Sequence, residues 1–570
     1  MKKFIHYLLV FCFVVSCKDK STTKLSQNEV VQNTTLTNFD TQINDLMAKM
    51  TLEEKIGQMN QYNGFWDATG PNPDKGKSAK KYEELRKGHV GSMLNIKEGV
   101  KQVKALQKIA VEETRLGIPL IIAFDVIHGF KTITPIPLAE AASWDLEAIK
   151  KSAQNAAEEA AAAGINWTFA PMVDTSRDPR WGRVMEGGGE DPYLGAKIAT
   201  ARIKGFQGKN LSSTKTIAAC AKHFAGYGFS EAGRDYNTVD IGTSTLNNVV
   251  FPPFKAAAEA GVKTFMNSFN ELNGIPATGN TFLQRDVLKG KWNFNGFVVS
   301  DWASMVEMIA HGYAEDEEHA AELSIKAGAD MDMESYVYVE HLANLVKRGS
   351  VKETLINDAV KRILKVKYEL GLFEDPYKYC DEEREKTVTG KQEFHDDALD
   401  MSKKSIVLLK NKKKLLPLKK KNQKIALIGA LAKDKTSPLG NWSLAGEPGS
   451  AVSVLEGLQK YKGNILKYAK GVDVITVDSP TGWSDKAIIN ETDTSGFSEA
   501  ITLAKKADVV VMVLGEHGIQ TGEARSRANI DLPGLQQELL EAVYKVNKNI
   551  VLVLTNGRPL TIPWADKNIP

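Results

Sequence analysis

The feature that most constrains the fold of this chain is a regular alternation of short apolar runs and helix-like stretches over residues 40–375. Ala- and Glu-rich stretches such as 145–163 and 314–327 have the composition of helices. Strands that alternate with helices over such a length predict a parallel sheet closed into a TIM barrel of the (β/α)8 type. An eighth strand cannot be placed, so an irregular barrel fits the pattern equally well. The seven apolar runs that we predict as strands are 89–95, 118–124, 167–173, 217–221, 262–267, 297–300 and 329–333.

A second α/β unit is predicted beyond the barrel. Residues 376–400 are rich in charge and are predicted to form a linker to residues 401–570. That C-terminal stretch contains three apolar runs, at 424–429, 509–515 and 550–555, which suit a buried parallel sheet. The sequence stops shortly after the third run, so we expect this α/β sandwich domain to be incomplete at its C-terminus.

The N-terminal residues have the pattern of an export signal. Two lysines precede an apolar stretch, 4–15, that is too short to span a membrane as a helix. The sequence Val-Val-Ser-Cys that follows resembles a bacterial lipobox, in which Cys17 would become the lipidated N-terminus. In the alternative, residues 1–17 are an ordinary secretory signal and Cys17 is incidental. Residues 18–39 are polar and predict a flexible tether, so we expect an exported protein of the periplasm or outer membrane with a lipid anchor.

The composition argues against several classes of function. The 73 basic and 70 acidic residues give a net charge of only +3, which does not favour a nucleic-acid partner. The sequence contains no Cys-x-x-Cys pair, His-Glu-x-x-His helix, P-loop or Gly-x-Ser-x-Gly elbow. The common motifs of zinc sites, NTPases and serine hydrolases are therefore missing. Contact with a membrane is expected only through the lipid anchor.

Polar side chains follow four of the predicted strands at the point where each strand ends. In a parallel barrel these ends share one face, and barrel enzymes carry their active sites there. A single aspartate after a strand is more often a helix N-cap than a nucleophile, but four polar clusters in succession favour a functional site. The clusters are Asp125 with His128, Asp174 with Arg177–Arg183, Lys222 with His223, and Asp301 with Trp302.

The residue types in these clusters suit a sugar. Carboxylates accept, and Arg, Lys and His side chains donate, the hydrogen bonds that sugar hydroxyls make. We expect the nearby cations to hold the pKa of Asp301 down, as a nucleophilic carboxylate requires. Glycoside hydrolysis needs a second carboxyl group, and Glu523 in the second unit is the candidate. The residues expected to bind one terminal ring are Asp125, Arg183, Lys222 and His223.

Four longer motifs resemble those of one known family. The most specific is 287–304, Val-Leu-Lys-Gly-Lys-Trp-Asn-Phe-Asn-Gly-Phe-Val-Val-Ser-Asp-Trp-Ala-Ser. Arg-Trp-Gly-Arg at 180–183, Gly-Glu-Asp-Pro-Tyr at 189–193 and Lys-His-Phe-Ala-Gly-Tyr-Gly at 222–228 accompany it. Through these motifs residues 40–570 resemble glycoside hydrolase family 3, of the periplasmic bacterial β-glucosidase type, and 287–304 resembles its nucleophile signature.

The resemblance implies a role for each residue of the site. Asp301 would be the nucleophile, and Trp302 and Trp442 would hold the aglycone sugar. Met266 and Phe269 would line the pocket for the nonreducing-end glucose, which the four ring-binding residues named above would hold. Many family members carry Tyr where Phe269 stands, so a hydroxyl contact to the nucleophile is expected to be absent here.

The acid/base carboxyl group would come from the second domain, on a variable loop. Glu523, in Gly-Glu-Ala-Arg-Ser-Arg, resembles the family pattern, whereas the rival Glu516 directly follows a strand and is expected to be structural. The resemblance implies a retaining, exo-acting β-glucosidase that releases glucose from the nonreducing end of β-linked gluco-oligosaccharides. Such a mechanism requires no metal and no organic cofactor.

Two alternatives stay open. Family 3 also contains β-xylosidases and other exo-glycosidases, and a non-catalytic, glycan-binding lipoprotein could carry the same pocket. The hexosaminidase branch is disfavoured because it has Lys-His-Phe-Pro-Gly-His-Gly where this chain has Lys-His-Phe-Ala-Gly-Tyr-Gly.

Overall fold

The computed structural model describes residues 39–64, 76–96, 99–412, 414–480 and 485–570. Residues 40–570 form one compact unit, separate from residues 1–39. The predicted signal peptide with Cys17, and the tether up to residue 38, lie outside the described residues. Across the described ranges, no helix is long and apolar enough to cross a bilayer.

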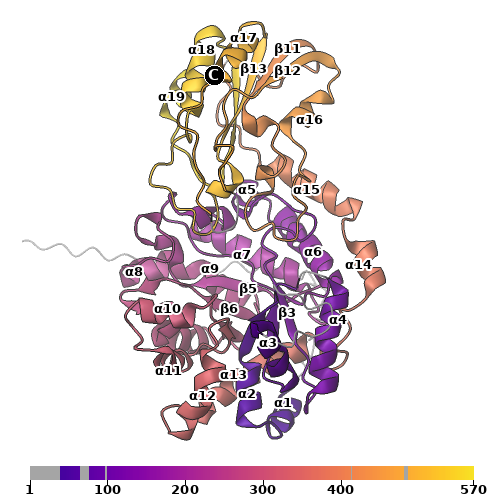
Figure 1. The fold of residues 1–570 in the computed structure, drawn as a ribbon, viewed down its shortest axis with the longest axis vertical. Helices are drawn as coiled ribbons and strands as arrows, with labels where there is room; N and C mark the ends of the chain where they lie inside the picture. Colours follow the sequence, from indigo (N-terminus) through magenta and orange to yellow (C-terminus); the bar gives the residue numbers. More distant parts are fainter. Residues whose placement is uncertain (1–38, 65–75, 97–98, 413, 481–484) are drawn as a thin grey trace, which may run out of the picture. The chain divides into compact units, whose positions relative to one another are not determined.

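Eight parallel strands of the described chain close into a barrel (Figure 1). Five pair in the order β10-β1-β2-β3-β4 and three in the order β5-β6-β9. The parallel bridges Trp167–Ala218 and Val299–Met331 join the two sheets at both of their edges. The predicted (β/α)8-type barrel is therefore confirmed. Its strands are β1 (Asn60–Asn63), β2 (Ser92–Leu94), β3 (Ile121–Phe124), β4 (Trp167–Thr168), β5 (Cys220–Phe224), β6 (Thr264–Asn267), β9 (Phe297–Val299) and β10 (Asp332–Met333).

The strand that the sequence did not identify is β1. Its sequence, Asn-Gln-Tyr-Asn, contains no apolar run, yet it pairs in parallel with both β2 and β10. Its buried amide nitrogens find partners, since Gln61 Nε2 donates to Ser92 Oγ at 2.8 Å and Asn60 Nδ2 to His89 O at 3.1 Å. A polar strand is thus accommodated because hydrogen bonds offset the cost of its burial.

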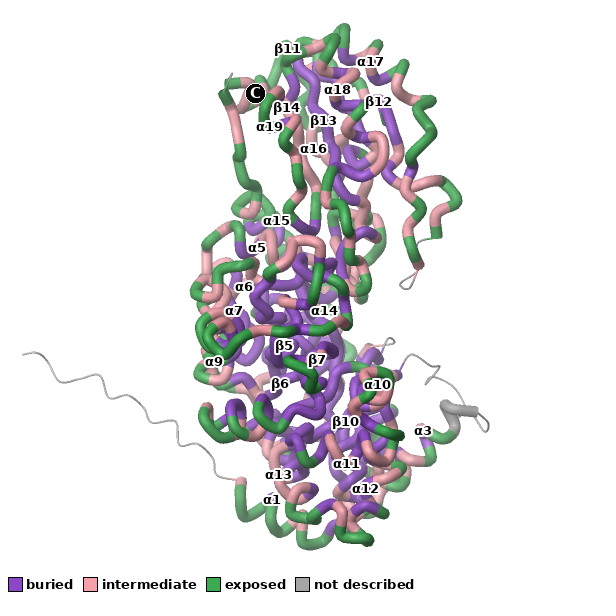
Figure 2. The backbone as a smooth tube through the Cα atoms, turned by 90° about the vertical axis from the view of Figure 1, so that its left-hand side faces the viewer, coloured by how far each residue is buried: buried purple, intermediate pink, exposed green. Residues whose placement is uncertain are grey.

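Helices surround the barrel and cover its strands, which are the buried centre of this domain (Figure 2). The Ala-rich helix α6 packs closely on α7. Gly205 of α7 lies so near α6 that a Cβ on it would be only 2.5 Å from the carbonyl oxygen of Lys150. The helices are α1 (Asp40–Met47), α2 (Leu52–Gln58), α3 (Gly76–Arg86), α4 (Val100–Lys108), α5 (Pro137–Ala142), α6 (Leu146–Ala162), α7 (Pro192–Gln207), α8 (Thr243–Thr245), α9 (Phe251–Glu259), α10 (Ser304–Ala310), α11 (Glu317–Ala327), α12 (Val337–Lys347) and α13 (Glu353–Glu369).

The segment predicted as a linker, 376–400, is largely helical. It contains α14 (Glu382–Val388) and most of α15 (Gln392–Ser405). Helix α15 is bonded to the barrel helix α6: Lys391 Nζ, at the N-cap of α15, lies 2.8 Å from Glu158 Oε1, and Asn155 Nδ2 donates to Asp397 Oδ2 at 2.8 Å. Helix α14 is bonded to α4, where Val100 N donates to Glu385 Oε1 at 3.3 Å. The charged residues of this stretch thus form ion pairs along the barrel wall.

The second sheet is parallel, in the order β12-β11-β13-β14. The fully buried β13 separates two apolar layers, with Val510 and Met512 on one face and Val511 and Val513 on the other. The three predicted strands correspond to β11, β13 and β14, whereas β12 escaped detection because exposed residues alternate along it. The elements are β11 (Lys421–Ile428), β12 (Gly463–Ala469), β13 (Val509–Gly515), β14 (Ile550–Thr555), α16 (Val454–Gln459), α17 (Phe497–Lys505), α18 (Gln536–Val546) and α19 (Pro563–Asn568).

Candidate active site at the barrel mouth

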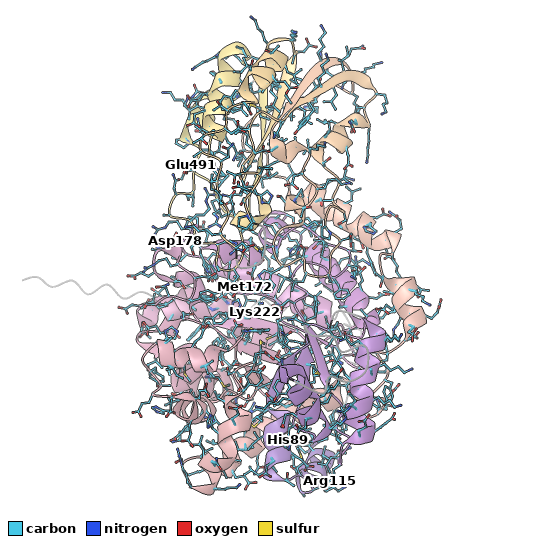
Figure 3. All side chains as sticks on the ribbon, in the orientation of Figure 1. His89, Arg115, Met172, Asp178, Lys222 and Glu491 are labelled. Atoms are coloured by element: carbon cyan, nitrogen blue, oxygen red, sulfur yellow. The ribbon has the colours of Figure 1, made fainter. Side chains whose placement is uncertain are left out.

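The carboxyl ends of the barrel strands gather most of the predicted polar residues. Asp125 follows β3, Lys222 and His223 lie in β5, and Asp301 follows β9. Lys222 Nζ donates to Asp125 Oδ1 at 3.2 Å, and His223 Nε2 lies 3.7 Å from Asp301 Oδ2. Figure 3 labels Lys222 near the middle of the barrel domain, beside Met172, with which it forms a parallel bridge. The topology thus brings residues far apart in sequence to one face.

Arg183 is a buried cation beside this cluster. It lies in a 3-10 turn, η2 (Gly182–Glu186), and pairs twice with Glu186, from Nε at 2.8 Å and from Nη2 at 2.9 Å. Its guanidinium lies over the rings of Tyr227, at 5.5 Å, and Trp442, at 5.7 Å. Its third nitrogen, Nη1, lies 3.6 Å from Oε2 of Glu523. Arg183 therefore links the barrel to the second predicted carboxyl group.

Glu523 reaches the barrel on a loop between β13 and α18. The Tyr236 hydroxyl donates to its Oε1 at 2.7 Å, and the backbone N–H groups on either side of it are also bonded to the barrel. Gly522 N donates to Gly182 O at 2.9 Å, and Ala524 N donates to Asp235 Oδ2 at 2.6 Å. The loop therefore presents a carboxyl group from the second unit to residues of the barrel.

The carboxyl group of Glu516, the alternative acid/base candidate, bonds to residues of its own domain. Its Oε1 accepts from Arg527 Nη1 at 2.7 Å and from the fully buried Arg558 Nε at 2.9 Å. Its Oε2 accepts from Gly557 N at 3.1 Å. These bonds support the expectation that Glu516 is structural.

Several buried polar atoms of the site have no hydrogen-bond partner among the described residues. The same side chains contact one another: the His223 and Tyr227 rings meet edge to face at 5.2 Å, and Arg183 lies over Tyr227. Orphaned buried donors and acceptors are costly, so a cluster of them indicates a polar ligand. The atoms are Arg183 Nη1, His223 Nε2, Tyr227 Oη and Asp301 Oδ2.

Burial governs the protonation of both carboxyl groups. It raises the pKa of Asp301 to about 8, helped by Glu523, although Arg183 and Lys222 lower it. The prediction that neighbouring cations hold this pKa down is therefore wrong, because loss of solvent outweighs them. Burial likewise raises the pKa of Glu523, against the effect of Arg183. The site thus favours the protonated form of each carboxyl group more than water does.

His223 is neutral in this environment. Burial, and then the charges of Arg183 and Lys222, lower its pKa well below the usual value. Its Nδ1 lies 2.9 Å from Asp174 Oδ2, so the ring proton belongs on Nδ1. Its Nε2 is then left as an acceptor that faces Asp301.

The aromatic residues occupy two regions. Trp442 is partly buried and lies beside the charged cluster, with Lys222 Nζ 5.0 Å over its ring and its Nε1 donating to Glu186 Oε1 at 2.6 Å. Trp302 is 39% exposed, so it lies at the rim, and its backbone N–H donates to Asp301 Oδ1 at 2.7 Å.

The two predicted pocket-lining residues are buried. Phe269 contacts the rings of Tyr227 and Tyr236, at 6.0 Å and 5.0 Å. Met266 lies in β6, directly opposite Val299 of the neighbouring strand that leads to Asp301.

Three residues support the site from behind: Asp174, which the sequence placed in a polar cluster without assigning it a role, and Glu186 and Tyr236, which the sequence analysis missed. Asp174 orients His223, Glu186 holds both Arg183 and Trp442, and Tyr236 contacts Glu523. In the sequence, Glu186 is connected with the site only by its position three residues after Arg183, which is a predicted sugar-binding residue. Tyr236 gave none, because its partner lies 287 residues away.

Comparison with known proteins identifies the family. A model described as "Glycosyl hydrolase family 3 N terminal domain" matches residues 51–366, and "Glycosyl hydrolase family 3 C-terminal domain" matches residues 406–570. The chain belongs to glycosyl hydrolase family 3. It is therefore a glycoside hydrolase, as its motifs indicate.

Individual relatives agree with this assignment. This family 3 chain is 39% identical to a periplasmic beta-glucosidase of Salmonella typhimurium, over 93% of the chain and 69% of that protein. It is 37% identical to a beta-xylosidase of Formosa agariphila, over 82% of the chain and 66% of that protein. Among solved structures, beta-glucosidase from Listeria innocua in complex with glucose matches with a TM-score of 0.84 and 37% identity, over 93% of the chain and 71% of that structure.

The two carboxyl groups of the second unit should differ in their effect on stability. We expect Glu516→Gln to lower the free energy of unfolding by about 3–5 kcal/mol, because it leaves the buried Arg558 without its charged partner. Glu523→Gln should not lower the free energy of unfolding, because burial disfavours the ionised carboxyl group and the neutral amide avoids that cost. Urea unfolding of both variants at pH 7 measures the difference. Equal destabilisation would contradict the structural assignment of Glu516.

Stability should also depend on pH through Asp301. Its pKa rises from 3.8 to about 8 on folding, so the folded state favours the protonated carboxyl. This contribution is fully present below about pH 4 and is lost as the pH rises to about 8. Relative to the natural chain, Asp301→Asn should therefore gain roughly 1–3 kcal/mol of stability between these two values.

The measurement is urea unfolding of both proteins across pH 4 to 9. Asp478→Asn, at an exposed position, is the matched control and should follow the natural chain. Parallel curves for the natural chain and Asp301→Asn would contradict the raised pKa.

Proposed function

We propose that this family 3 enzyme is a retaining, exo-acting β-glucosidase with Asp301 as the nucleophile and Glu523 as the acid/base. The observation that carries the proposal is that two carboxyl groups from two domains reach one cluster of polar side chains: Glu523 Oε2 lies 3.6 Å from Arg183 Nη1, and Asp301 Oδ2 lies 3.7 Å from His223 Nε2. In this proposal the enzyme releases glucose from the nonreducing end of β-linked gluco-oligosaccharides.

The proposed reaction has two displacements. The ionised carboxylate of Asp301 attacks the anomeric carbon while protonated Glu523 gives its proton to the glycosidic oxygen, so the aglycone leaves as an alcohol. The resulting glycosyl–Asp301 ester is cleaved by water, whose proton passes to the Glu523 carboxylate. The original proton states are then restored. Such a mechanism predicts carboxyl groups about 5–5.5 Å apart.

The terminal glucose lies in the polar cluster. The Asp125–Lys222 pair offers both an acceptor and a donor to adjacent hydroxyls, and neutral His223 offers an acceptor at Nε2. Trp442 and the exposed Trp302 provide apolar faces for the aglycone sugar. Phe269 and Met266 complete the apolar lining of the pocket.

The names of the relatives support glucose as the sugar that is released, and they also support a second candidate, xylose. The Salmonella relative is named a beta-glucosidase, and a mutant of the Listeria enzyme was solved with laminaribiose, a β-linked glucose disaccharide. The two Formosa relatives are named beta-xylosidase and putative beta-xylosidase, which makes xylosidase activity the alternative. A non-catalytic glycan-binding role is not favoured, because both carboxyl groups are present in the site.

A mechanism-based label tests the proposal. We expect 2-deoxy-2-fluoro-β-glucosyl fluoride to leave a fluoroglucosyl ester on Asp301, because its reactive leaving group bypasses the acid step. Peptide mass spectrometry locates the ester, and Asp301→Asn is the control that should remain unlabelled. An adduct on another residue would overturn the nucleophile. Labelling only by the xylosyl analogue would establish the xylosidase alternative.

We also propose that the protein is exported and lipid-anchored through Cys17. The support is the signal-like sequence of residues 1–17, and the Salmonella relative is named periplasmic. The mature N-terminal peptide from a bacterial host should carry acyl chains on Cys17 by mass spectrometry, and Cys17→Ser should release the enzyme from membranes. An unmodified Cys17 in a membrane-free enzyme would favour an ordinary secretory signal.

A further inference from the structure

We infer that Tyr236 is a positioning residue that fixes which oxygen of Glu523 carries the catalytic proton. The inference rests on the proposed role of Glu523 as acid/base. Its starting point is the 2.7 Å hydrogen bond from the Tyr236 hydroxyl to Glu523 Oε1, which joins the barrel to the second domain.

Tyr236 is held rigidly on the barrel side. Its backbone is in the left-handed region, at φ 63°, and its ring packs edge to face on the buried Phe269 at 5.0 Å. The preceding Asp235 is fixed at both carboxylate oxygens, since Trp181 Nε1 donates to Oδ1 at 2.8 Å and Ala524 N donates to Oδ2 at 2.6 Å. The hydroxyl therefore presents itself to Glu523 from a fixed position.

The hydrogen bond gives the two carboxyl oxygens of Glu523 different roles. Burial and the nearby Glu523 raise the pKa of Tyr236, so its hydroxyl keeps its proton and acts as a donor. Glu523 Oε1 must then accept, which leaves Oε2 as the oxygen that carries the proton. Oε2 is also the oxygen that faces Arg183 Nη1, the orphaned donor of the site, at 3.6 Å.

The proton balance follows from this division. In the first step the Oε2–H bond breaks, the proton joins the glycosidic oxygen as that oxygen leaves C1, and Asp301 bonds to C1. In the second step water bonds to C1, its proton returns to Oε2, and the Asp301–C1 bond breaks. Tyr236 keeps its own proton throughout.

The loop that carries Glu523 does not need Tyr236 to stay in place. Arg558, held by Glu516, donates to Arg180 O at 2.7 Å and to Arg525 O at 2.8 Å. Backbone bonds from Gly522 to Gly182 and from Arg527 to Arg180, at 2.9 Å and 3.0 Å, anchor it further. The hydroxyl of Tyr236 is therefore available for a chemical role.

The test compares Tyr236→Phe with the natural chain on β-glucosides of two leaving groups. With 2,4-dinitrophenol, which leaves without a proton, kcat/KM should change less than about twofold. With a poor leaving group such as methanol, kcat/KM should fall about 10- to 100-fold, the size expected for loss of a positioned charge-assisted bond. Because the bond favours the ionised carboxyl, its loss should also move the basic limb of the kcat/KM profile to higher pH.

Tyr377→Phe is the matched control. The Tyr377 hydroxyl makes the same kind of bond, to Glu112 Oε1 at 2.7 Å, on the turn η1 (Ile109–Glu113) that precedes β3. This end of the barrel is opposite to the active site, so all kinetic values should remain unchanged. Equal losses of Tyr236→Phe on both substrates, or no loss on either, would overturn the positioning role.

A failure of the proposed function would look different. Glu523→Ala should spare the dinitrophenyl substrate in kcat/KM and should yield β-glucosyl azide when azide is added. If that variant instead hydrolyses methyl β-glucoside normally, Glu523 is not the acid and the role of Tyr236 falls with it. If Glu523→Ala behaves as expected and Tyr236→Phe does not, only the inference about Tyr236 is overturned.

Discussion

The buried guanidinium of Arg183 is the interaction on which the active site depends. A charge taken out of water is costly unless partners surround it, and several kcal/mol are lost when one partner is removed. The charged partner of Arg183 is the bidentate Glu186, and the carboxyl of Glu523 and the faces of Tyr227 and Trp442 surround the rest of the guanidinium. Glu523 and Trp442 belong to the second domain. The contacts of this one barrel cation therefore also hold the second domain against the barrel at the site.

A second buried arginine, Arg558, anchors the loop that carries Glu523, the proposed acid/base. It is fully buried, is neutralised by Glu516, and donates to three carbonyl oxygens on both sides of the domain contact. Loops of irregular structure are usually mobile, and a general acid on such a loop would lose its geometry. Here the loop is anchored by charge-assisted bonds from behind, while Tyr236 bonds to the carboxyl from the front.

The strands with apolar sequences and the residues that follow them could be predicted from the sequence. The signals were local: four of the seven predicted apolar runs ended in a polar cluster, as in β9 and Asp301. The polar strand β1 was missed because its stability comes from partners on β2 and β10 rather than from its own sequence. Glu186 and Tyr236 were missed for the same reason, because their roles come from partners on other parts of the chain. The direction of the Asp301 pKa shift was also mistaken, since burial cannot be read from the neighbours in sequence.

That shift has a consequence for the proposed chemistry. An ionised Asp301 in a pocket where it is 8% exposed lacks the water that would stabilise it. The transition state of glycoside hydrolysis develops positive charge at the anomeric carbon, so attraction to the carboxylate grows as the reaction proceeds and is little screened. Neutral His223, 3.7 Å from Asp301, adds no competing positive charge. The burial that raises the pKa of the free carboxyl group is therefore the same feature that strengthens its interaction with the reacting sugar.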